Sequence, residues 1–202
     1  MRRAFRTSTV IALALAFVHL HAGAASNAAI AIDAARVTLA GTSNVHEYTA
    51  ASTTVRVTKA QLAAPAADAD FWDSALKPGA LEAFAIAIPA TSLKSDKDGL
   101  DKNMYKALKA AEHPDITFKL ARFESIDGRT FAMGTLGIAG VEREVAIDLT
   151  TARRGDALVV KGAIDLLMTD YGIAPPKAMM GMLKTNPKVT VRFEVTLAVA
   201  LT

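Results

Sequence analysis

Apolar side chains occupy every second position near the C-terminus, and this alternation limits the possible folds more than any other feature of the sequence. It runs without interruption from Val189 to Val199, and the intervening positions are mostly polar. Because successive side chains of a β-strand point to opposite faces, this period of two predicts a strand with one buried and one solvated face. Residues 145–149 and 158–168 repeat the pattern on either side of a turn at residues 154–156, RGD, which predicts two neighbouring strands of a hairpin.

A second hairpin is predicted around Asp127-Gly128, a pair that strongly favours a two-residue turn. Apolar residues alternate over 116–120 before this turn and return at Phe131 and Met133 after it. Beyond Gly134 they move to the opposite parity, which predicts a bulge or a bend at the glycine. With shorter patterns nearer the N-terminus, the sequence predicts about eight or nine antiparallel strands, and therefore a closed barrel or a sandwich.

One helix is predicted inside this all-β pattern, near residues 98–111. Apolar residues recur there at intervals near four and form a single stripe, while the lysines between them are expected to stay in solvent. Asp96 or Asp98 is the expected N-cap, and Pro114 prevents the helix from continuing. Such a helix commonly covers the end of a barrel, and the long strand 157–168 would span about 40 Å. A deep barrel of about eight strands, which can hold one small ligand, is favoured over a sandwich.

Residues 1–25 have the three parts of a secretory signal: basic residues, an apolar run over 10–20, and small residues at 22–24. The apolar run has about half of the roughly 20 residues that a membrane-spanning helix needs. We therefore expect a signal peptide at 1–25, a single domain at 26–202, a periplasmic location, and no stable transmembrane segment after cleavage. The three arginines of this segment account for the whole excess of 23 Lys and Arg over 20 Asp and Glu. Without it the chain is close to neutral, which argues against nucleic-acid binding.

The remaining chemistry is sparse, because the sequence contains no cysteine and only His46 and His113 outside the first 25 residues. Two histidines without a thiol do not complete a tetrahedral structural zinc site, and no phosphate-binding loop, zinc-protease motif or nucleophile elbow is present. We expect no catalytic residues, no metal and no cofactor. One alternative is a Cu(I) site, because thioether sulfurs suit that ion and Met179, Met180 and Met182 lie close together in the sequence.

Several ordered motifs resemble those of the YceI-like family of exported lipid-binding proteins. In order along the chain they are GTSNVH at 41–46, IP at 88–89, SL at 92–93, LDKNM at 100–104, HPDITF at 113–118, GTLGIAGV at 134–141 and MTDYGIAPP at 168–176. The resemblance covers roughly residues 29–201, and it is specific through the order and spacing of the motifs. This chain departs from many relatives at 101–104, where they carry a bulkier aromatic pair a little further on, and at 46–48, in a variable region.

The resemblance implies a lipocalin-like antiparallel barrel with a long apolar tunnel, which in some members holds a polyisoprenoid chain. An apolar tunnel with a polar mouth suits such a ligand. The candidate ligand-binding residues are Phe84, Ile86, Phe118, Phe131, Met133, Met168, Tyr171, Ile173, Met179, Met180, Met182 and His46. Their alternation indicates that the strand residues face inward. A solid barrel in which they are ordinary core residues would produce the same pattern.

The hypothesis from the sequence is a non-catalytic periplasmic protein that encloses a polyisoprenoid or another lipid chain inside the barrel. The alternatives are a Cu(I)-binding protein that uses its methionines, and a structural β-domain without a ligand. The oligomeric state stays open, a dimer included.

Overall fold

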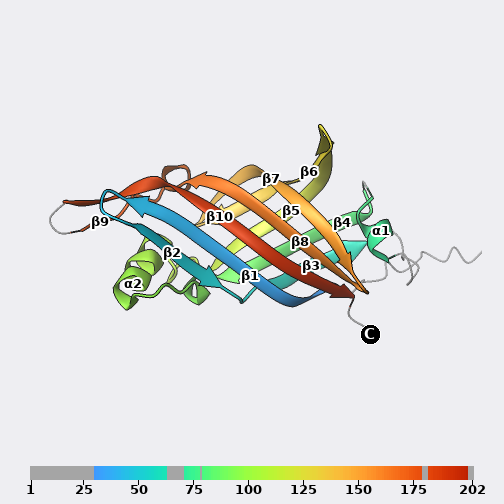
Figure 1. Ribbon diagram of the computed structural model, residues 1–202, viewed down its shortest axis with the longest axis horizontal. Helices are drawn as coiled ribbons and strands as arrows, with labels where there is room; N and C mark the ends of the chain where they lie inside the picture. The colour runs from blue at the N-terminus through green and yellow to red at the C-terminus, as the bar shows by residue number, and fades with distance from the viewer. Residues whose placement is uncertain (1–29, 63–70, 78, 179–181, 200–202) are drawn as a thin grey trace, which may run out of the picture.

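The computed structural model describes residues 30–62, 71–77, 79–178 and 182–199 (Figure 1). The expected signal peptide, residues 1–25, lies outside the described residues, as do Met179 and Met180. The strands are β1 (Ile30–Ser43), β2 (Glu47–Ser52), β3 (Arg56–Leu62), β4 (Leu81–Pro89), β5 (Asp115–Ile126), β6 (Arg129–Ile138), β7 (Val141–Arg154), β8 (Ala157–Leu167), β9 (Lys177–Ala178) and β10 (Leu183–Val199). The helices are α1 (Phe71–Ala75), α2 (Asp98–Ala107) and two 3₁₀ turns, η2 (Ala90–Ser92) and η3 (Met168–Tyr171).

The strands form one antiparallel sheet in the order β2-β1-β10-β8-β7-β6-β5-β4-β3, and the short β9 pairs with β10 beside it. The sheet curls into a half-barrel, so that β1 and β10 lie in front of β4 and β5 in Figure 1. The all-β, antiparallel, lipocalin-like fold expected from the sequence is therefore confirmed. Within the described residues no ladder joins the edge strands β2 and β3. Full closure of the barrel stays a prediction.

The predicted turns explain the short connections along the sheet. Asp127 and Gly128 have φ angles of 50° and 75°, so both adopt the left-handed conformation of a two-residue type I′ turn between β5 and β6. Ala139 and Gly140 do the same between β6 and β7, with φ angles of 51° and 82°. Gly155, at 59°, makes the predicted turn between β7 and β8. These tight turns join consecutive antiparallel strands directly.

The predicted helix forms, but it is shorter than expected and is capped differently. It ends at Ala107 rather than near residue 111, because Lys109 takes a left-handed φ of 51° and turns the chain away. The N-cap is Lys97, which makes no side-chain capping bond, so the expected cap at Asp96 or Asp98 is wrong.

The sequence did not predict the second helix, α1. Its residues Phe71, Trp72 and Ala75 are buried in a cluster with Leu62 and Leu158. The indole Nε1 of Trp72 donates a hydrogen bond to the carbonyl oxygen of Asp156, at 2.8 Å. Five residues are too few to show a helical period, so only the tertiary contacts reveal α1. The two helices lie at opposite ends of the barrel (Figure 1).

The expected bulge lies opposite Gly134 and not on its own strand, and the expectation that Phe131 and Met133 face inward is wrong. Strand β6 pairs with β7 in an unbroken register, and its inward residues are Ala132, Leu136 and Ile138. The shift lies instead on β5, between Leu120 and Arg122. Gly134 lies on the inward face, and a Cβ there would overlap the ring of Phe118 and the carbonyl of Lys119. The missing side chain makes room for the ring.

A Gly134→Ala substitution tests this placement. The added methyl group meets backbone as well as a ring, so we expect a loss of about 1–3 kcal/mol in the free energy of unfolding, as for other overpacked cores. The neighbouring Met133→Ala change removes a side chain on the outer face and should cost less than about 1 kcal/mol. Urea denaturation followed by circular dichroism measures both. A larger loss for Met133→Ala than for Gly134→Ala would contradict the assigned faces.

Candidate functional site

The inward faces of the strands enclose a cavity of about 830 Å³. It extends from the α1 end, where Trp72 and Leu158 line it, to the α2 end, where Met104 and Leu108 do. The lining is almost entirely apolar and includes residues from both walls of the curled sheet. The alternative of a solid barrel predicted an interior filled by side chains, and this cavity contradicts it. A volume of this size is typical of small-molecule binding sites.

Aromatic rings lie over glycines on the cavity wall, and this packing helps to keep the interior open. In each case a Cβ on the glycine would overlap the ring, so only glycine permits the contact. The three pairs are Tyr48 over Gly41, Phe118 over Gly134 and Phe193 over Gly162. In each pair, the glycine and the aromatic residue lie on two neighbouring strands of the sheet. Each ring packs against the backbone of its glycine, where a side chain would otherwise be.

The structure brings most of the predicted binding residues to this cavity. Those that line it are Phe84, Ile86, Phe118, Met168, Tyr171, Ile173 and His46. Phe131 and Met133 do not line it, because they lie on the outer face of β6, where the Arg129 guanidinium stacks 5.4 Å from the centre of the Phe131 ring. Met182 is 66% exposed, away from the lining. Met179 and Met180 lie outside the described residues.

Sequence reasoning missed several lining residues. Phe193 was visible in the alternation of the last strand, whereas Trp72 carried no periodic signal. Lys106 and Lys109 were expected to stay in solvent, and they are exposed, yet both also line the α2 end of the cavity. Their role depends on the orientation of the helix, which the stripe of apolar residues alone does not specify.

The two ends of the cavity differ in polarity. Ser43, His46 and Asn103 join Lys106 of α2 and Lys109, which follows the helix, in the lining at the α2 end. His46 is held there by Ser43, whose hydroxyl donates to the His46 carbonyl oxygen at 2.8 Å and accepts from the His46 amide at 3.1 Å. At the α1 end, the polar group of Trp72 is already hydrogen-bonded to the backbone. The polar mouth therefore lies beside α2.

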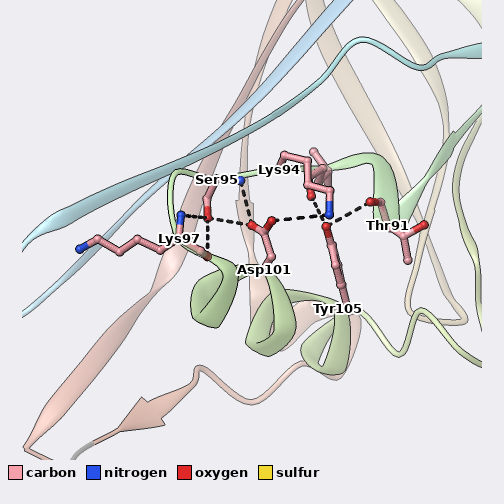
Figure 2. A network of polar contacts seen from close by, with 7 residues as sticks. Thr91, Lys94, Ser95, Lys97, Asp101 and Tyr105 are labelled. Carbon is pink, nitrogen blue, oxygen red and sulfur yellow. Dashed lines mark hydrogen bonds and ion pairs between the residues drawn. The ribbon is translucent and has the colours of Figure 1, made fainter.

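A buried carboxylate anchors α2, and Figure 2 shows its contacts. Asp101 is only 4% exposed, and it accepts hydrogen bonds from the Ser95 hydroxyl at 2.7 Å and the Ser95 amide at 2.8 Å. The ammonium group of Lys94 lies 3.7 Å from its other oxygen. The hydrogen bond from the Ser95 hydroxyl is the main cause that holds the pKa of Asp101 below its ordinary value, and Lys94 acts in the same direction.

Tyr105 makes a second contact from the same helix (Figure 2). Its hydroxyl donates to the carbonyl oxygen of Leu93 at 2.7 Å and lies 3.1 Å from that of Thr91. The Lys94 ammonium sits 5.1 Å above its ring. Lys94 in turn pairs with Ala51 of β2 through two backbone hydrogen bonds of 2.8 Å. The loop before α2 therefore connects the helix to the edge of the sheet.

A match to a protein-family model identifies the family to which this chain belongs. The model of the YceI-like domain matches residues 25–197. The chain belongs to the YceI-like family. A comparison with curated protein sequences gave no match. The resemblance inferred from the ordered motifs is thus confirmed, over nearly the same residues.

Solved structures of YceI-like and similar proteins share the fold. Burkholderia cenocepacia BcnA is 13% identical, with a TM-score of 0.62 over 80% of this chain and 95% of its own. A polyisoprenoid binding domain from Saccharophagus degradans, implicated in plant cell wall breakdown, is also 13% identical, with a TM-score of 0.61 over 86% of this chain and 99% of its own. The Campylobacter jejuni YCEI protein is 19% identical, with a TM-score of 0.50 over 74% and 85%.

Two further observations concern only the part of the chain that the structure describes. No group of three His, Asp or Glu side chains there is arranged to hold a metal ion. None of the helices in residues 30–62, 71–77, 79–178 and 182–199 has the length and apolar character needed to cross a membrane.

The anchor of α2 should fail in acid. The pKa of Asp101 is lower in the folded protein, so the unfolded chain takes up its proton first as the pH falls. The stabilisation by this carboxylate is therefore complete above its ordinary pKa of about 3.9 and is lost below it. We expect Asp101→Asn to lower the urea midpoint at pH 7, and the gap from the unchanged protein to narrow near pH 3. The exposed Asp98→Asn, in the same helical turn, is the control and should show little gap at either pH. A gap for Asp101→Asn that does not depend on pH would contradict this role.

Proposed function

We propose that this YceI-like protein binds a long apolar chain, a polyisoprenoid, inside the barrel and acts as a non-catalytic carrier in the periplasm. The observation that carries the proposal is the apolar cavity of about 830 Å³ between α1 and α2. An isoprenoid chain needs apolar contact along its length and few hydrogen bonds, which is what this lining offers. The fold shared with a polyisoprenoid binding domain of Saccharophagus degradans supports the choice of ligand.

The energetics favour a long chain over a short one. Each buried methylene contributes about 0.8 kcal/mol, so an isoprene unit of about five carbons contributes roughly 4 kcal/mol before the cost of ordering it. Affinity should therefore rise with each unit until the cavity is full. The described residues of the lining carry mostly hydrocarbon side chains, which suit the binding of an apolar chain. The basic and apolar pattern of residues 1–25 supports export, and a carrier is useful where an apolar chain must cross water.

A residue in the middle of the cavity wall provides a direct test. Ile164 lines the cavity on β8, and its neighbour Ala163 is exposed on the outer face of the same strand. The Ile164→Trp variant should fill the cavity and abolish binding of geranylgeraniol, whereas Ala163→Trp should bind as the unchanged protein does. Native mass spectrometry detects the bound lipid, and the thermal midpoint reports it independently. A ligand at about 100 times its Kd stabilises the folded state by about 2.7 kcal/mol.

The result that would overturn the proposal is equally specific. If the unchanged protein, purified from its natural compartment, yields no lipid on organic extraction and gains no thermal stability from added isoprenoids, the barrel does not carry such a chain. Circular dichroism of both tryptophan variants serves as the control for folding. Equal binding by Ile164→Trp and Ala163→Trp would place the ligand outside the cavity.

A further inference from the structure

Two tyrosine hydroxyls are buried without a partner, and both residues line the cavity. The hydroxyls of Tyr48 and Tyr171 have no hydrogen-bond partner among the described residues, although both atoms are shielded from solvent. Tyr171 is 2% exposed. Buried polar groups nearly always have a partner, because an unsatisfied hydroxyl loses its hydration without compensation. Two buried hydroxyls that lack a partner among the described residues, in a mostly apolar cavity, therefore indicate that something else supplies the partner.

Both tyrosines belong to the same end of the cavity. Tyr48 pairs with Gly41 across β1 and β2, and Gly41 pairs with Val189 across β1 and β10. Val189 in turn belongs to the buried cluster that contains Tyr171. This is the α2 end, where Met104 packs on the same cluster. Both tyrosines thus lie toward the α2 end of the cavity, far along the strands from Trp72 at the α1 end.

The local backbone geometry determines where each tyrosine side chain lies. A Cβ at position 41 would overlap the hydroxyl of Tyr48, so the glycine creates the space that this group occupies. Tyr171 is held in η3, which Gly172 ends with a left-handed φ of 65°. Burial raises the pKa of both tyrosines, and Asp170 adds to the effect at Tyr171, while Arg143 opposes it weakly. Both side chains are therefore neutral phenols at physiological pH, and each O–H is able to donate a hydrogen bond.

The basic side chains at this end are exposed to solvent, whereas the two tyrosine hydroxyls are buried. Lys106 and Lys109 line the rim but are exposed, as is His46. A phosphate beside the two hydroxyls would lose water and gain neutral donors, with the carboxylate of Asp170 near Tyr171 opposing its charge and only the exposed Arg143 favouring it. An uncharged oxygen needs no such compensation, and a neutral phenol is a sufficient partner for it.

We propose that the bound chain has one orientation, with an uncharged hydroxyl or carbonyl head group hydrogen-bonded to Tyr48 and Tyr171 at the α2 end and its apolar tail directed toward Trp72. This inference rests on the proposed function, because it assigns the direction and the head group of the same ligand. It makes the two tyrosines the residues that set the head-group preference of the site.

The test compares three ligands that share one chain: farnesol, farnesyl phosphate and the hydrocarbon farnesene. Trp72 is the only tryptophan of the sequence and lines the tail end, so its fluorescence reports binding directly. We expect the unchanged protein to prefer farnesol to farnesene by about tenfold or more. Tyr48→Phe and Tyr171→Phe should each lower farnesol affinity about threefold to tenfold, as for one lost hydrogen bond, and leave farnesene affinity unchanged.

The control is Tyr105→Phe, because the hydroxyl of Tyr105 has backbone partners and this residue does not line the cavity. It should lower the unfolding midpoint and keep the preference for farnesol. The Tyr48→Phe and Tyr171→Phe variants should keep or raise the midpoint of the ligand-free protein, because each removes an unsatisfied hydroxyl. If Tyr48→Phe fails to fold, Gly41→Ala replaces it, since this change displaces the Tyr48 hydroxyl and keeps the tyrosine.

Each outcome separates this inference from the proposed function. Equal affinity of the unchanged protein for farnesol and farnesene overturns the head-group assignment and leaves the carrier function intact. Tighter binding of farnesyl phosphate, lost on Lys106→Ala and Lys109→Ala, also overturns it. Binding of none of the three, with longer isoprenoids also failing, overturns the proposed function itself. A bromine on the tail carbon of farnesol should quench Trp72, and quenching only by a bromine near the hydroxyl would reverse the orientation.

Discussion

The hollow centre of this protein depends on the continuous antiparallel ladder that runs from β2 round to β3. Its backbone hydrogen bonds hold the two walls of the curled sheet at a fixed separation, so the inward side chains need not meet to keep the fold together. In a packed domain those side chains would interdigitate at close to crystal density. Here they line about 830 Å³ instead. The loss of packing across that space is what a ligand is able to offset when it binds.

The two helices turn this hollow sheet into a container with different ends. At the α1 end, Trp72 uses its one polar group on the backbone and offers only its ring to the cavity. At the α2 end, Asp101 and Tyr105 attach the helix to the preceding loop, and Lys94 attaches that loop to β2. These polar contacts hold the helix over the mouth, and Leu100, Met104 and Ala107 on its other side line the cavity. This asymmetry is the basis for the proposed placement of the head group at the α2 end.

Much of the fold was predictable because β-structure leaves local signals. The alternation from Val189 to Val199 identified β10, and Asp127-Gly128 identified the β5–β6 turn, since that turn requires two positive φ angles. The face of β6 was assigned wrongly at Phe131 and Met133. Large apolar residues ordinarily indicate the buried face, but here the inward positions carry alanine and glycine. The ring of Phe118, from the neighbouring strand β5, occupies the space that Gly134 leaves without a side chain.

By itself the sequence determined the antiparallel strands, their short turns, one helix, the neutral chain beyond residue 25 and the YceI-like pattern of motifs. All of these depend on neighbours within a few residues or on the order of motifs. The tertiary structure alone decided that the interior is hollow and that Trp72 covers one end. It also decided that the hydroxyls of Tyr48 and Tyr171, toward the other end, have no partner among the described residues. The physical reason is that alternation specifies which way a side chain points. The distance to the opposite wall depends on the curl of the whole sheet.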